Sequence, residues 1–65
     1  MKKGKLIRHL LNNGCLPTGR QKGSHAQWKN AATGARTSVP VHSDINEFTA
    51  LGICKQLGIP PVKFN

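Results

Sequence analysis

One histidine of the sequence lies among basic residues in a pattern that could support acid–base chemistry on a phosphate. His25 follows a Gly-Ser pair in the stretch RQKGSHAQW, residues 20–28, between Lys22 and Lys29. Imidazole gives and takes protons near neutral pH, and general acid–base catalysis accelerates a reaction roughly 10²–10⁴-fold. We therefore take His25 as the candidate catalytic residue. The alternative is a surface or half-buried histidine that has no chemical role.

A phosphodiester of RNA is a substrate that fits these side chains. RNA carries its own nucleophile, the 2′-hydroxyl, so cleavage requires neither a serine or cysteine nucleophile nor a metal ion. One group must accept the 2′-hydroxyl proton, and cations must stabilise the pentacoordinate phosphorane. We expect Lys22 and Lys29 to contact phosphate, because they flank His25 most closely in the sequence.

Other residues near His25 have both a functional and an ordinary interpretation. Arg20 and Arg36 could bind phosphate or serve as solubilising charge. Gly23 could let the backbone approach RNA or make a turn, and Ser24 could bond a phosphate or begin a strand without any function. His42 could act with His25 as an acid–base pair if strand pairing brings them together, or it could cap the following turn.

The two cysteines do not indicate a metal site. Cys15, Cys54, His25 and His42 offer four possible zinc ligands, but their spacings match no metal motif. We expect neither a metal nor a small-molecule cofactor. A single disulfide between the cysteines remains open.

The composition favours one small domain that recognises a large anion. A chain of 65 residues buries a thin core, so residues 1–65 are expected to form one domain without a deep cleft. Ten basic residues against two acidic ones give a formal charge of +8, which attracts polyanions. The basic start has no long apolar run, and no segment could span a membrane. We expect a cytoplasmic protein that does not associate with a membrane.

The elements that must position these side chains follow from hydrophobic periodicity. Apolar residues at helical spacing predict a helix over residues 3–13. A last helix that closes at Gly58 is predicted by the apolar stripe of Ala50, Leu51, Ile53, Cys54 and Leu57. Alternation predicts strands over 24–29 and 36–42. Pro17 makes any strand at 15–20 irregular or an edge strand. Lys22-Gly23 predicts a turn, and Asp44-x-x-Glu47 a capping box, with Thr49 as a second N-cap candidate. Trp28 is expected in the core.

The resulting order, α-β-β-β-α, and several local motifs resemble the HicA toxin family. The motifs are Gly4-Lys5 before a Leu-rich helix, RQKGSH at 20–25, VPVH at 39–42 and KQLGI at 55–59. The resemblance implies an α+β fold like the double-stranded-RNA-binding domain, with a three-stranded antiparallel sheet and two helices on one face. Ala26 stands where members often carry a second histidine, and Phe48-Thr49 where they usually carry Gly-Thr.

The resemblance also implies an activity and two partners. It implies ribosome-independent cleavage of mRNA, with the catalytic histidine at His25, and neutralisation by a HicB-like antitoxin. The alternatives are a non-catalytic RNA-binding module and a small basic ribosome-associated or structural protein. Duplex-binding domains of this fold usually carry cations at the start of the last helix, where Asp44 and Glu47 stand here. This favours a single-stranded substrate.

Overall fold

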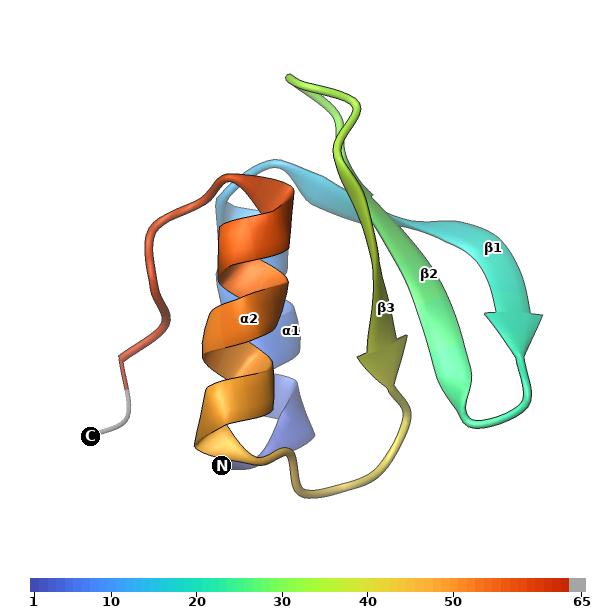
Figure 1. Ribbon diagram of the computed structural model, residues 1–65, viewed down its shortest axis with the longest axis vertical. Helices are drawn as coiled ribbons and strands as arrows, with labels where there is room; N and C mark the ends of the chain where they lie inside the picture. Colours follow the sequence, from blue (N-terminus) through green and yellow to red (C-terminus); the bar gives the residue numbers. More distant parts are fainter. Residues whose placement is uncertain (64–65) are drawn as a thin grey trace.

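The chain folds in the predicted order α-β-β-β-α. The structure, a computed structural model, describes residues 1–63 (Figure 1). The elements are α1 (Lys3–Asn12), β1 (Cys15–Lys22), β2 (His25–Asn30), β3 (Arg36–Pro40) and α2 (Glu47–Leu57). The fold class expected from the sequence, a small α+β domain with one antiparallel sheet, is therefore confirmed.

The sheet has the strand order β1-β2-β3, and both neighbouring pairs are antiparallel. The turn between β1 and β2 consists of Gly23–Ser24, one residue later than predicted, and Lys22 pairs directly with His25. Gly23 has a φ of 60°, and Ser24 has a negative φ, as the two central residues of a type II′ hairpin turn require. Glycine adopts a positive φ without strain. This short turn sets the register on both sides of His25.

Strand β1 is an irregular edge strand, as Pro17 predicted. Its register with β2 shifts between Pro17 and Gln21, so the three residues 18–20 face a single residue, Gln27. Gly19 has a φ of 83° at this point. The bulge bends the strand away from β2 and changes the direction in which Arg20 leaves the backbone.

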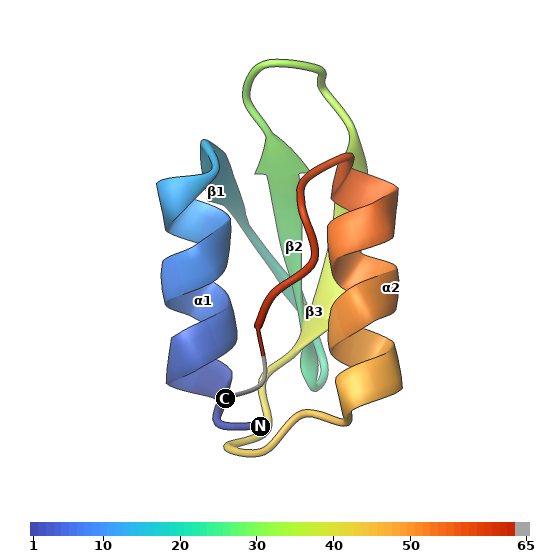
Figure 2. The ribbon, with the colours of Figure 1, turned by 90° about the vertical axis from the view of Figure 1, so that its left-hand side faces the viewer.

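Both helices pack on the same face of the sheet, and the C-terminal segment runs between them (Figure 2). The core contains the apolar side of each element, as expected from the periodicity, together with two residues outside helices and strands. Its buried members are Leu6, Leu10, Cys15, Trp28, Val39, Ile45, Ala50, Ile53, Cys54, Leu57 and Val62. Trp28 is 5% exposed, which confirms its expected place in the core.

Asn30, the last residue of β2, connects the sheet to the last helix by a side-chain hydrogen bond. This residue is buried, its side-chain amide donates to the carbonyl of Leu57 at 2.7 Å, and its Oδ1 accepts from the amide of Ala32 at 2.9 Å. Both hydrogen bonds satisfy backbone groups that would otherwise lack a partner. The β2–β3 connection and the C-terminus of α2 are thus held together.

The predicted end of β3 and the two predicted caps of α2 were wrong. Strand β3 ends at Pro40 rather than at His42, although the amide of Val41 still donates to the carbonyl of Ser24 at 2.8 Å. Asp44 does not cap α2, because the N-cap is Asn46, whose Oδ1 accepts from the amide of Phe48 at 2.8 Å. Thr49, the second candidate, lies inside the helix.

One residue of the predicted apolar stripe of α2 departs from it. Leu51 is 36% exposed, whereas Ala50, Ile53, Cys54 and Leu57 are buried. The first helix ends at Asn12, one residue earlier than predicted, and Gly14 follows with a left-handed φ of 79°.

Candidate nucleic-acid interface

The sheet face opposite the helices carries the predicted cations. Residues that pair directly across antiparallel strands point to the same face, so the register defines rows across it. One end row contains Lys22, His25 and Pro40; the other contains Leu16, Lys29 and Arg36. Gln27 and Ser38 form the row between them, and the Gln27 Nε2 donates to the Ser38 Oγ at 2.6 Å.

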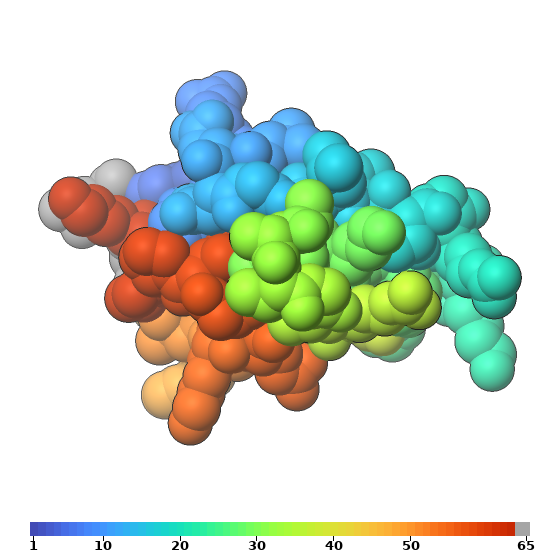
Figure 3. All heavy atoms as spheres, turned by 90° about the horizontal axis from the view of Figure 1, so that it is seen from above, coloured from blue at the N-terminus to red at the C-terminus, as the bar shows by residue number. Residues whose placement is uncertain are grey.

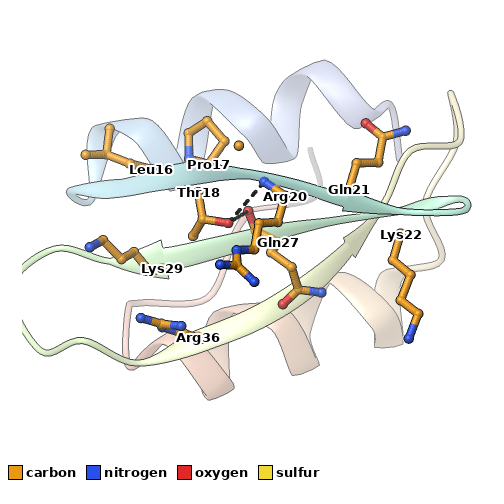
Figure 4. Close-up of a pocket in the computed structure, with 10 residues that line it drawn as sticks. Leu16, Pro17, Thr18, Arg20, Gln21, Lys22, Gln27, Lys29 and Arg36 are labelled. Carbon is orange, nitrogen blue, oxygen red and sulfur yellow. Dashed lines mark hydrogen bonds between the residues drawn. The ribbon is translucent and has the colours of Figure 1, made fainter.

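Four cations surround an open hollow of about 1170 Å³ on this face. They are Arg20, Lys22, Lys29 and Arg36, and neither acidic residue of the chain lines the hollow. Figure 4 shows Lys29 and Arg36 at one end, Lys22 at the other, and Arg20 and Gln27 between them. A shallow surface of one charge sign suits an extended anion better than a small molecule.

Arg20 reaches the centre of the hollow because of the bulge in β1. Its backbone amide donates to the Thr18 Oγ1 at 3.4 Å, and the same hydroxyl donates to the carbonyl of Gln27 at 3.4 Å. These contacts connect the bulge to β2 (Figure 4).

His25 is exposed and lies at the margin of the hollow rather than in its lining. It is the first residue of β2, directly after the Gly23–Ser24 turn. Seen from above, the end of the β1–β2 hairpin stands out from the body of the molecule (Figure 3). An imidazole in this place is accessible to a strand that lies along the sheet.

The two lysines that flank His25 in the sequence take different positions in the fold. Lys22 is the direct cross-strand neighbour of His25, so their Cβ atoms are about 5 Å apart. Lys29 is four positions further along β2, about 13 Å away at the rise of a β-strand. Lys29 instead lies opposite Arg36. Closeness to His25 in the sequence therefore does not make Lys29 a neighbour of His25 in the fold, whereas Lys22 is one.

His42 lies at the same end of the sheet as His25 but beyond the end of β3. It is exposed, and it comes two residues after Pro40, the partner of His25 in the register. Among residues 1–63, neither imidazole makes a hydrogen bond to another residue.

Sequence reasoning overlooked two residues of interest. Gln27 lines the hollow, and the alternation of β2 places it on the same face as His25, so the pattern itself contained this signal. His9, a residue of α1, donates from Nε2 to the carbonyl of Pro60 at 2.7 Å. That contact ties α1 to the C-terminal segment, and no local pattern indicates it.

The four residues that could have formed a zinc site do not gather. Cys15 and Cys54 are free thiols in the core, whereas His25 and His42 are exposed at the end of the sheet. Within the described part of the chain, no three His, Cys, Asp or Glu residues lie together as a metal site would require. None of the described helices is long and apolar enough to cross a membrane.

Comparison with known families assigns the chain to one class of protein. The family model described as "HicA toxin of bacterial toxin-antitoxin" matches residues 4–59, which includes every helix and strand except the first residue of α1. The chain belongs to the HicA toxin family, the toxin class of bacterial toxin–antitoxin systems, and membership implies an antitoxin partner of HicB type. Comparison with curated proteins and with solved structures gave no match.

Proposed function

We propose that this chain is an mRNA-cleaving endoribonuclease toxin that uses His25 as its acid–base group and requires no metal or cofactor. The observation that carries the proposal is the direct pairing of His25 with Lys22 at the margin of a cationic sheet face. The pairing supports the proposal because an imidazole and an ammonium group on neighbouring strands can act on the same phosphodiester. Family membership supports the proposal, because HicA toxins are generally ribonucleases.

The chemistry is a transesterification within the RNA strand. His25 accepts the proton of the 2′-hydroxyl, the 2′-oxygen forms a bond to phosphorus, and the bond from phosphorus to the 5′-oxygen breaks. The protonated His25 then donates a proton to the 5′-oxygen. The products are a 2′,3′-cyclic phosphate and a 5′-hydroxyl, so atoms and protons balance without another reactant.

The other predicted residues bind the RNA near the scissile phosphate or assist the proton transfer. Lys22 stabilises the charge of the phosphorane, and Arg20 holds the strand over the centre of the hollow. Ser24 and Gly23 form the exposed turn beside His25, where a hydroxyl and an uncovered backbone can approach phosphate. His42, at the same end of the sheet, is an auxiliary group that can supply the leaving-group proton in place of His25.

The single-stranded form of the substrate follows from the distribution of charge. Four of the ten cations line the sheet face, whereas Asp44 and Glu47 stand just before and at the start of α2 and would repel the phosphates of a duplex lying there. An antitoxin of HicB type would neutralise the toxin by covering His25 or by misplacing β2, with acidic groups against the basic sheet face.

The test is cleavage of a defined mRNA in EDTA by the native chain and by His25→Ala, with the product ends mapped. Metal-independent cleavage that leaves 2′,3′-cyclic or 3′-phosphate ends, and that falls by at least roughly 10²-fold in the variant, is expected. Lys55→Ala, which removes a cation from α2, is the matched control and should cleave like the native chain.

The competing function is RNA binding without cleavage. Because His25 stands at the margin of the hollow, the four cations could hold RNA without its help. Equal RNA binding by the native chain and His25→Ala, with no cleavage by either, would replace the nuclease with a binding module.

A further inference from the structure

Three of the four cations of the sheet face fall into two groups at its opposite ends, and the fourth, Arg20, lies between them (Figure 4). Lys22 is beside His25, whereas Lys29 and Arg36 are direct cross-strand partners at the opposite end of the face (Figure 4). His25 and Lys29 are four positions apart on β2, a distance of about 13 Å along the strand. Consecutive phosphates of one strand are joined by a single ribose unit and lie closer together than this.

We propose that Lys29 and Arg36 form a second phosphate subsite, which binds a phosphate of the same RNA strand other than the one cleaved at His25. The proposal rests on the proposed function, because it places the scissile phosphate between His25 and Lys22. The strand then lies along β2, and the shortest substrate that uses the whole face extends beyond a dinucleotide.

On β2 and β3, the surface between the two groups is uncharged and suits a ribose or base rather than a phosphate. The middle row is uncharged, and Gln27 and Ser38 bond to each other there. Arg20 is the only cation of the lining that stands over this part, and it can contact the intervening strand from the side of β1 (Figure 4). Leu16, which is 49% exposed, is the other cross-strand neighbour of Lys29 and supplies apolar contact to a sugar or base.

This arrangement predicts binding by the backbone rather than by base sequence. Stacking on aromatic side chains is a main source of base contact in single-strand binding proteins. Trp28 is buried on the opposite face of β2, and Phe48 is on α2, so neither can stack a base in the hollow. The second subsite therefore adds affinity and substrate-length dependence without adding base specificity.

The test compares native chain and the variant K29A/R36A on single-stranded oligonucleotides of increasing length, from the dinucleotide upward, in EDTA. For the native chain, kcat/KM should rise with length and level off once the strand reaches Lys29 and Arg36. The variant should lose roughly tenfold more kcat/KM on the longer oligonucleotides than on the dinucleotide, since a hydrogen bond to a charged group is lost. The matched control, K55A/K63A, removes two cations outside the sheet face and should keep the native length profile.

A binding measurement keeps this inference separate from the proposed activity. Oligonucleotides with 2′-O-methyl riboses cannot be cleaved, because their nucleophile is blocked. For a long single strand of this kind, the variant should reduce the slope of log affinity against log salt by about 0.7, the value for one lost phosphate contact. This result would support the subsite even for a chain that cleaves nothing, whereas absence of cleavage by the native chain would count only against the nuclease.

Several results would overturn the subsite. An equal loss of kcat/KM at every length would place Lys29 and Arg36 at the scissile phosphate. A loss seen with duplexes but not with single strands would assign the face to duplex RNA. An unchanged RNA affinity together with weaker binding of the antitoxin would make the pair a protein contact. Far-ultraviolet circular dichroism of each variant excludes unfolding as the cause.

Discussion

At the scale of single residues, burial separates the groups that can react from those that cannot. His25 is exposed, while both cysteines lie in the core, at 0% exposure for Cys15 and 1% for Cys54. Burial raises the pKa of both thiols above the ordinary value of 9.0, and the nearby Cys54 thiolate raises that of Cys15 further. The native protein therefore holds these protons at a pH at which the unfolded chain releases them.

This difference predicts a loss of stability in alkaline solution. The contribution of the thiols is fully present below 9.0, the value in the unfolded chain, and is lost as the pH rises toward the raised pKa of the folded state. The free energy of unfolding should therefore fall above 9.0, as measured by urea denaturation from neutral to alkaline pH. The variant Cys15→Ala/Cys54→Ala should show a shallower fall, and an identical pH dependence would contradict this origin.

At the scale of elements, a cap decides where the last helix begins. Asn46 accepts a hydrogen bond from the amide of Phe48, which satisfies one of the free amides of the first turn of α2. Asn46→Ala should therefore lower the free energy of unfolding by about 1 kcal/mol in chemical denaturation. Thr49→Ala is the control and should change stability by less than about 0.5 kcal/mol. A larger loss of stability for Thr49→Ala than for Asn46→Ala would contradict Asn46 as the N-cap and favour Thr49, the second candidate from the sequence.

The shape of the edge strand β1 depends both on its own sequence and on its pairing with β2. Pro17 predicts an irregular edge strand, and β1 is one. The extent of the bulge depends on which residues of β1 oppose Gln27, and that pairing involves a second strand. Because the bulge turns Arg20 over the hollow, a feature of one element determines the shape of the binding face.

At the scale of the whole molecule, the charge of +8 stabilises complexes with anions and destabilises the free fold. Salt screens the repulsion among the cations, with a Debye length of about 8 Å at physiological ionic strength. The midpoint of thermal unfolding should rise by about 4 °C from low to physiological NaCl, which is equivalent to roughly 1 kcal/mol for a domain of this size. The variant K55E/K63E, which halves the formal net charge of +8, should show a smaller rise. An equal rise in both proteins would assign the effect to something other than net charge.

Much of the fold could be predicted because it depends on neighbours along the chain. Helical spacing identified the buried Leu6 and Leu10, and alternation identified the buried Trp28 and Val39. The ends of helices and strands were harder to predict. Strand β3 ends at Pro40, where its pairing with β2 ends, and Asn46 rather than Asp44 or Thr49 caps α2. Ile45 and Val62 join the core from segments without periodicity, so only tertiary packing reveals their burial.

For the candidate site, the sequence by itself determined the chemical groups, their charge and the face of each strand on which they lie. Alternation is a local property of extended backbone, so His25, Gln27 and Lys29 share a face whatever the rest of the chain does. Which cation stands beside His25 depended on the tertiary structure. The Gly23–Ser24 turn brings Lys22 opposite His25, and the β2–β3 pairing brings Arg36 opposite Lys29. Along the chain, Lys22 and Lys29 are both close to His25. In the fold, the cross-strand register puts Lys22 beside His25 and Lys29 at the far end of the sheet. That register depends on the turns and on the bulge, which involve more than one strand.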